Sequence, residues 1–340
     1  MAPDVGTGLI GVLAGGIFNG SFVAPIKLMR RWSWETSWLV YSVSSLLIIP
    51  WVFALLTIPR LGELYRSADP STVLTVLGYG FGWGIGSVLF GIGVNRMGLA
   101  VGYGIILGLL APIGTFYPLI MLHPERLWTA QGRALMIGTA IVLCGIVLCA
   151  RAGKLRENAS GMPPAGAAGG SSFTSGLVIC ILAGVFSPML NFTFVFGEPL
   201  QSRAIAFGAS PSMASNAIWP LALTAGVLAN AGYCIYLLNR NRSWKEFRGA
   251  EGNHWFFGCL MGALGFASFL IYGLGATALG SLGGIVGWPL FMSMSLITSN
   301  LLGAFSGEWR GAPAVAWRYS MGGITLLIVA ITVIARGGQG

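Results

Sequence analysis

The sequence predicts an all-α integral membrane protein, with ten transmembrane helices arranged as two inverted five-helix repeats. The prediction rests on the composition, on recurring apolar segments, and on short similarities between the two halves of the chain. Of the 340 residues, 55% are hydrophobic and only 9% are charged, whereas a soluble domain carries about 25% charged residues. This composition excludes an ordinary soluble protein.

Apolar segments recur along the chain, each close to the roughly 20 helical residues that cross about 30 Å of hydrocarbon. Short polar stretches separate them. The segments expected to cross the bilayer are residues 7–25, 36–58, 72–94, 98–121, 131–150, 173–196, 212–238, 254–275, 279–303 and 313–336. Almost no chain is left for a domain outside the membrane.

A run rich in Gly, Pro, Ala and Ser, residues 161–172, divides the ten segments five and five. Such a run cannot form a packed core and behaves as a flexible linker. The expected organisation is a first five-helix repeat at 1–153, a flexible cytoplasmic linker at 154–172 and a second five-helix repeat at 173–340.

Short motifs recur in the two halves. Leu13-Ala14-Gly15-Gly16 resembles Leu182-Ala183-Gly184-Val185, and Cys149-Ala150-Arg151-Ala152-Gly153 resembles Ile334-Ala335-Arg336-Gly337-Gly338. Because five is odd, a second copy of a five-helix unit enters the bilayer upside down. This is the inverted-repeat architecture of many secondary transporters.

The chain carries a net charge of +9, and its 19 Lys and Arg residues lie singly or in small groups between the apolar segments. This placement is typical of an orientation signal and argues against nucleic-acid binding. With ten crossings, thirteen basic residues fall on one face: Lys27, Arg30, Arg31, Arg96, Arg151, Lys154, Arg156, Arg240, Arg242, Lys245, Arg248, Arg310 and Arg318. The richer face is expected to be cytoplasmic, so both termini are expected outside.

The chain has 52 glycines and five cysteines, and the cysteines all fall within predicted helices. Small residues let helices pack closely in lipid, although some glycines could instead let helices bend during gating. No Cys-x-x-Cys pair, metal-ligand spacing, Ser/His/Asp arrangement or nucleotide-phosphate motif is present. We therefore expect no enzyme, no catalytic residue, no metal site and no bound cofactor.

Several motifs carry a family resemblance. They are Ala24-Pro25-Ile26-Lys27, Arg30-Arg31-Trp32-Ser33-Trp34-Glu35-Thr36, Pro50-Trp51, Pro59, Trp83-Gly84-Ile85-Gly86, Phe90-Gly91, Arg96-Met97-Gly98, Gly102, Arg151-Ala152-Gly153-Lys154 and Gly307-Glu308-Trp309. With these motifs the chain resembles the L-rhamnose-proton symporter family of the drug/metabolite transporter superfamily. The resemblance spans the chain and is strongest in its first half.

The resemblance implies a multi-pass protein of the bacterial inner membrane with ten helices and both termini periplasmic. It implies uptake of a deoxyhexose such as L-rhamnose by alternating access, with the proton as coupling ion. The expected partners are a small sugar and the lipid bilayer, and the expected state is a monomer or a homodimer. Two alternatives are an uncoupled facilitator and a carrier of another small polar metabolite.

A sugar site needs hydrogen-bonding groups and an aromatic face within a mostly apolar cavity. The candidates are polar or amphipathic side chains within predicted spans: Asn19, Trp83, Ser87, Tyr103, Asn191, Tyr272 and Trp288. Asn19 and Asn191 lie in the first helix of each half and are expected to face one another. Alternatively, an asparagine forms a structural bond between helices, or a tryptophan belongs to an interfacial belt.

Proton coupling needs a group that gains and loses a proton, yet no predicted helix centre contains Asp, Glu or His. The candidates are therefore Glu35 and Glu198, which lie at helix ends. Glu35 could instead stabilise the first turn of its helix and pair with Arg30 or Arg31. Glu198 could instead be a solvated helix end. The lack of central carboxylates is what keeps the facilitator alternative open.

Overall fold

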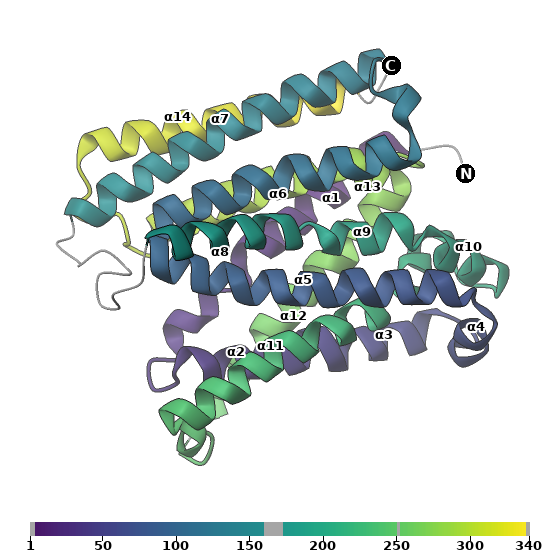
Figure 1. Ribbon diagram of the computed structural model, residues 1–340, viewed down its shortest axis with the longest axis horizontal. Coiled ribbons are helices and arrows are strands. Elements are labelled where there is room, and N and C mark those ends of the chain that lie inside the picture. Colours follow the sequence, from purple (N-terminus) through teal and green to yellow (C-terminus); the bar gives the residue numbers. More distant parts are fainter. Residues whose placement is uncertain (1–3, 160–172, 250–251, 338–340) are drawn as a thin grey trace. The chain divides into compact units, whose positions relative to one another are not determined.

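The computed structural model describes residues 4–159, 173–249 and 252–337, and Figure 1 shows it as a ribbon diagram. These residues form helices and connecting turns, with no strand among them. Most of the predicted linker, residues 160–172, lies outside the described part of the chain. The all-α prediction is confirmed for the described residues.

Within the described chain, ten segments are long and apolar enough to cross a membrane. They are Val5–Leu28, Trp34–Thr57, Pro70–Met97, Val101–Leu122, Ala130–Ala159, Thr174–Ala206, Pro211–Asn241, Gly252–Ala278, Gly283–Phe305 and Ala314–Gly337. Each overlaps one predicted segment. The fifth and sixth continue past their predicted ends at residues 150 and 196. The count is confirmed because the length of an apolar run is a local property of the sequence.

Several spans are interrupted helices. The first consists of α1 (Val5–Ser21) and the 3-10 helix η1 (Ala24–Leu28), and the second of α2 (Trp34–Ser42), the π-helix η2 (Val43–Ile48) and α3 (Ile49–Thr57). The sixth consists of α8 (Phe173–Phe186), α9 (Met189–Phe196) and α10 (Glu198–Ala206), and the seventh begins with the 3-10 helix η4 (Pro211–Ala217) before α11 (Trp219–Asn241). Interrupted helices are typical of binding sites in transporters.

The remaining elements are more regular. They are α4 (Leu61–Ser67), α5 (Pro70–Met97), α6 (Leu99–Leu122), η3 (Pro124–Arg126), α7 (Ala130–Ala159), η5 (Ser243–Phe247), α12 (Gly252–Ala278), α13 (Gly283–Phe305) and α14 (Ala314–Gly337). Pro112 and Pro289 lie inside continuous helices, whereas Pro188 stands at the break between α8 and α9. Proline has no N–H group, so it weakens a helix at the turn that precedes it.

The chain forms two compact units, and each combines segments from both halves of the sequence. The first unit consists of Met1–Ile85 and Met189–Ser281, and the second of Gly86–Pro188 and Leu282–Gly340. Helix α5 contributes its first part to the first unit and its last part to the second. Each compact unit therefore contains segments of both predicted repeats, residues 1–153 and 173–340.

Glycine contacts bring α1 and α12 together in the first unit. A Cβ atom added to Gly11 would lie 2.8 Å from Gly275 Cα, and one added to Gly15 would lie 2.9 Å from the backbone nitrogen of Tyr272. Neither position has room for a side chain. Close backbone packing is thus the role of these glycines, as expected for helices that associate in lipid.

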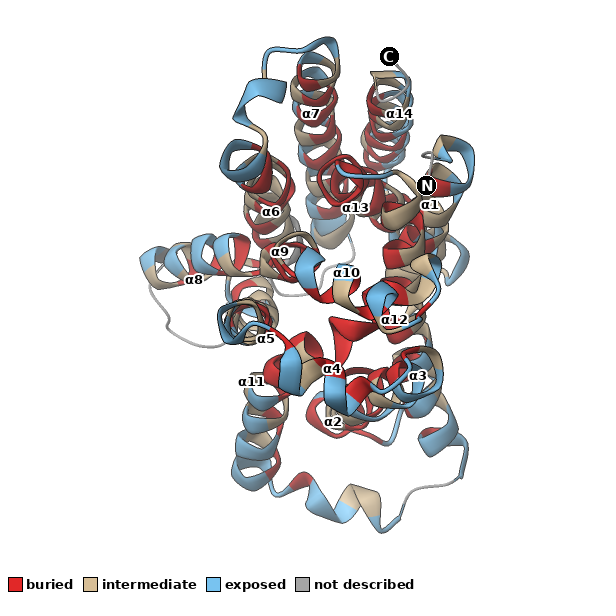
Figure 2. Ribbon diagram, turned by 90° about the vertical axis from the view of Figure 1, so that its right-hand side faces the viewer, coloured by how far each residue is buried: buried red, intermediate tan, exposed pale blue. Residues whose placement is uncertain are grey.

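In the second unit, α7 packs along α14 (Figure 1), and both helices alternate buried and exposed residues along their lengths (Figure 2). Helix α7 continues through Ala159, so residues 154–159 are helical although the sequence predicts them as linker. Arg156 in this extension forms an ion pair with Glu308 at 3.0 Å and lies over the ring of Trp309. These contacts stabilise the last turns of α7.

Candidate functional site

A buried hydrogen bond joins α9 and α12 in the first unit. The Tyr272 hydroxyl donates to Oδ1 of Asn191 at 2.6 Å, and the two side chains are 2% and 1% exposed. Asn191 follows the helix break at Ser187 and Pro188, which separates α8 from α9. Two of the predicted sugar-binding residues, 81 positions apart in the sequence, therefore meet in one place.

Aromatic rings line up beside this hydrogen bond. Trp83 of α5 meets Phe269 of α12 edge to face at 5.9 Å, and Phe269 lies 6.0 Å from Trp219 of α11. Trp219 stacks on Phe194 at 6.0 Å, and Phe194 lies 5.6 Å from Tyr272. Aromatic faces next to hydrogen-bonding groups are the combination that binds a pyranose, whose CH groups pack on rings while its hydroxyls form hydrogen bonds.

The position of Trp83 is fixed by close packing between α5 and α11. A Cβ atom on Gly226 would lie 2.8 Å from the Trp83 ring, and one on Gly84 would lie 2.5 Å from the Gly226 carbonyl oxygen. Asn230, one turn later on α11, donates to the Gly226 carbonyl at 3.1 Å and accepts from Trp38 Nε1 at 3.1 Å. This buried amide ties α2 to α11 where Trp83 packs.

Asn19 lies on the face of α1 that contacts α12. It follows Gly15 by four residues, and residues four apart on a helix share a face. Gly15 in turn packs on the backbone of Tyr272. Asn19 is half-buried. Of the predicted sugar-site residues, the first unit thus holds Asn19, Trp83, Asn191 and Tyr272.

The other three predicted sugar-site residues belong to the second unit. Trp288 of α13 is buried and donates from Nε1 to the Leu110 carbonyl at 3.3 Å. Tyr103, near the start of α6, meets Phe90 edge to face at 5.0 Å. Ser87 of α5 is half-buried. Leu110 follows Tyr103 by seven residues, so Trp288 contacts α6 about 10 Å along the helix from Tyr103.

Glu35 is the only buried carboxylate among the residues that the structure describes, with 6% exposure. It lies in the first turn of α2. Its Oε1 accepts hydrogen bonds from Asn241 Nδ2 and Ser243 Oγ, both at 2.9 Å. These neutral donors hold the buried carboxylate at the helix end.

Glu198 occupies a different environment in the first turn of α10. It is exposed, and its Oε1 accepts a hydrogen bond from Ser202 one turn later on the same helix. A carboxylate in the first turn of a helix is stabilised by the helix dipole. Burial therefore distinguishes Glu35 from Glu198.

Several residues near these groups were not among the predicted site residues. Phe194 and Phe269 complete the row of aromatic rings, and they give no sequence signal because Phe is common in apolar spans. Ser215 adjoins Gly273, with its Oγ 2.7 Å from where a Cβ would lie. His254 is 5% exposed and lies 5.6 Å from Trp32. Its place near a predicted helix end gave no sign of this burial.

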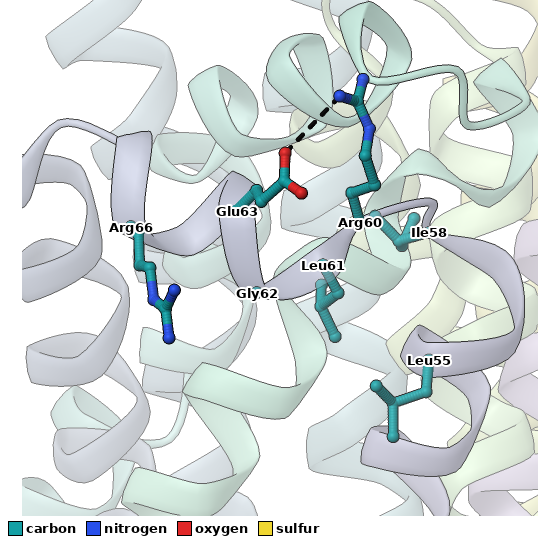
Figure 3. A pocket seen from close by; sticks show the side chains of 7 residues that line it. All are labelled: Leu55, Ile58, Arg60, Leu61, Gly62, Glu63 and Arg66. Carbon is teal, nitrogen blue, oxygen red and sulfur yellow. Dashed lines mark hydrogen bonds and ion pairs between the residues drawn. The ribbon is translucent and has the colours of Figure 1, made fainter.

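A separate pocket of about 390 Å³ lies beside α3 and α4. Figure 3 shows its lining, in which Arg60 points toward Glu63 and Arg66 extends from another side of the helix. Arg60 Nη1 lies 3.5 Å from Glu63 Oε2, and both side chains are more than half exposed. The pocket contains no predicted site residue. Among the described residues, no group of three His, Cys, Asp or Glu side chains could hold a metal ion.

Comparison with known proteins gives one consistent result. The model of the family described as L-rhamnose-proton symport protein (RhaT) matches residues 1–339. An L-rhamnose-proton symporter of Cronobacter sakazakii is 30% identical over 345 aligned positions, which cover 99% of each chain. Symporters with the same name from Escherichia coli and Citrobacter koseri are 28% and 27% identical with equal coverage.

The family model matches nearly the whole chain, and the described residues contain ten apolar spans, as a membrane transporter requires. The chain is a transporter rather than an enzyme, and it belongs to the L-rhamnose-proton symport protein family.

Proposed function

We propose that this protein imports L-rhamnose together with protons across a bacterial inner membrane. Its relatives named as L-rhamnose-proton symporters match it from end to end. The observation that carries the proposal within the structure is the buried Tyr272–Asn191 hydrogen bond beside a row of aromatic rings. A buried polar pair in an apolar bundle is typical of a site for a neutral polar solute.

In the proposed site, the sugar ring packs against Trp83 and its hydroxyls exchange hydrogen bonds with Asn191 and Tyr272. Asn19 lies on the helix face that packs on Tyr272 and is proposed to face the same sugar. Ser87, Tyr103 and Trp288 remain proposed sugar-binding residues, because each carries a hydroxyl group or an indole.

Glu35 is the proposed proton carrier, with Glu198 as the second candidate. Burial supports this order. A conformational change alters the surroundings of a buried carboxylate, and with them its tendency to bind a proton, whereas an exposed carboxylate stays in contact with water. Moving one proton down a membrane potential of about 100 mV releases roughly 2.3 kcal/mol. That energy supports about a fortyfold concentration gradient of a neutral sugar.

We propose alternating access between two inverted five-helix repeats, as in the drug/metabolite transporter superfamily. If the repeats start at the first and sixth spans, the later spans correspond in order. The second span is then equivalent to the seventh, the fourth to the ninth and the fifth to the tenth. These pairs contact one another as α2 with α11, α6 with α13, and α7 with α14. Contact between equivalent helices is expected around a pseudo-twofold axis.

The proposed orientation places both termini in the periplasm, since the face richer in Lys and Arg is expected in the cytoplasm. Protease or maleimide access to a tag on either terminus tests this orientation in oriented vesicles.

We propose that the protein is a monomer or a homodimer. Light scattering in detergent distinguishes the two states.

Uptake of radiolabelled L-rhamnose into proteoliposomes, with external pH recorded, tests the proposed function. A symporter accumulates the sugar and makes the outside more alkaline. A carrier without coupling shows counterflow without a pH change, and a channel shows neither counterflow nor accumulation. No transport of L-rhamnose would exclude the proposed substrate.

A further inference from the structure

Two buried polar atoms next to the aromatic row make no hydrogen bond with the described chain. They are Oγ of Ser215 in η4 and Nε1 of Trp219 in α11. The two residues are 0% and 1% exposed. A buried donor or acceptor without a partner lowers stability, so native proteins keep few of them and each needs an explanation.

Most hydroxyls and several indoles in the spans of this protein do have partners. Serine and threonine side chains bond back to a carbonyl three or four residues earlier at Ser44, Thr115, Thr193, Ser268, Ser293 and Ser295. The indole nitrogens of Trp38 and Trp51 donate to Asn230 and Thr224. Ser215 and Trp219 depart from this pattern one helical turn apart.

Both groups adjoin Gly273 on α12. A Cβ atom on Gly273 would lie 2.7 Å from Ser215 Oγ and 3.3 Å from Trp219 Cζ2. Gly273 directly follows Tyr272, whose hydroxyl bonds Asn191. Other buried polar atoms without partners, such as Ser42 Oγ on α2 and Thr139 Oγ1 on α7, belong to other helices than Ser215 and Trp219. The Ser215–Trp219 pair therefore lies at the candidate sugar site.

We propose that Ser215 Oγ and Trp219 Nε1 are hydrogen-bond partners for two hydroxyl groups of the transported sugar. The inference rests on the proposed function and adds two specificity-determining residues to it. The indole N–H can only donate, so it requires an oxygen acceptor, and the serine hydroxyl can donate or accept. A neutral aldose with neighbouring hydroxyls supplies both kinds of group. A site built to bond a hydroxyl rejects a substrate that lacks it.

The proposal predicts opposite effects on folding and on binding. In Ser215→Ala and Trp219→Phe, an unsatisfied polar atom is removed from the sugar-free protein, so its melting temperature should stay the same or rise. The Kd for L-rhamnose should rise about tenfold in each variant, since one hydrogen bond to the sugar is lost. Both values are measurable on the full-length protein in detergent, by thermal unfolding and by isothermal titration calorimetry.

Matched controls are Ser44→Ala and Trp51→Phe. These substitutions remove the same atoms, but from groups that hold hydrogen bonds in the sugar-free structure, Ser44 to the Val40 carbonyl and Trp51 to Thr224. They should lower the melting temperature and leave the Kd for L-rhamnose unchanged. The controls thus reverse the pattern of the test variants.

A set of deoxy analogues, each lacking one ring hydroxyl, sharpens the test. One analogue should bind Ser215→Ala and the native protein with equal affinity, and another should do so for Trp219→Phe, because the bonding partner is already gone. Native affinity for L-rhamnose in both variants would overturn the inference while leaving rhamnose transport intact. A fall in melting temperature as large as in the controls would also overturn it. If the native protein binds no aldose, the proposed function and this inference both fail.

Discussion

The Tyr272 hydroxyl and the Asn191 side chain form a 2.6 Å hydrogen bond between α12 and α9. Tyr272→Phe removes the donor and leaves a buried amide oxygen without this partner. We expect the variant to lose about 1–3 kcal/mol of unfolding free energy and to take up less L-rhamnose. Denaturation in detergent and uptake in proteoliposomes measure the two effects. In combination with Asn191→Leu, the loss of stability should be smaller than the sum of the single losses, and a strictly additive result would contradict coupling.

Trp83→Ala should abolish sugar uptake while the protein remains folded and inserted. The indole is held between α5 and α11 by close packing at Gly226, and it is proposed to offer the sugar an aromatic face. Uptake into proteoliposomes, with protein amount and melting temperature recorded, measures the effect. Trp128→Ala is the control, because that side chain is 72% exposed and lies outside the site. Full uptake by Trp83→Ala would remove this residue from the site.

Glu35→Gln should uncouple sugar movement from proton movement. The amide keeps the size of the side chain, but it cannot bind and release a proton. We expect counterflow of L-rhamnose to persist, whereas accumulation driven by a pH gradient and the external alkalinisation are lost. Glu63→Gln serves as the control, since the Glu63 side chain is 63% exposed, lies outside the proposed sites and should retain coupling. Proton-driven accumulation by Glu35→Gln would exclude this carboxylate as the carrier.

Two glycines on one helix should respond in opposite ways to the same substitution. A Cβ atom on Gly80 would lie 2.2 Å from the Ala222 carbonyl oxygen, whereas one on Gly78 would meet nothing within 4 Å. Gly80→Ala forces α5 and α11 apart and should cost about 1–3 kcal/mol. Gly78→Ala should be neutral or should stabilise the helix by up to about 1 kcal/mol. Thermal unfolding of the two variants compares them, and equal effects would contradict the close approach at Gly80.

The candidate site was predictable only in part. Asn191, Tyr272 and Trp83 could be selected because polar and amphipathic side chains within an apolar span need partners. Phe194 and Phe269 could not, since nothing in an apolar sequence separates a ring beside the site from one in contact with lipid. Ser215 resembles the many serines that bond their own helix. Only the structure shows that the Ser215 hydroxyl, in η4, has no hydrogen-bond partner in the described chain.

Helix boundaries were also predictable only in part. The break at Pro188 can be predicted from the sequence, because proline lacks an N–H group. The extension of α7 to Ala159 is not, since it depends on contacts of Arg156 with Glu308 and Trp309. A polar and flexible-looking segment becomes helical when a distant loop supplies partners for its charges.

The sequence by itself determined the ten crossings, because the length and polarity of each apolar run fix whether a helix can span the hydrocarbon. It also determined the family, through motifs distributed over the whole chain. Only the tertiary structure decided which residues meet. Tyr272 joins Asn191, and Ser215 and Trp219 meet at Gly273, because glycines let particular helices approach closely, and that choice of partners depends on packing among distant segments.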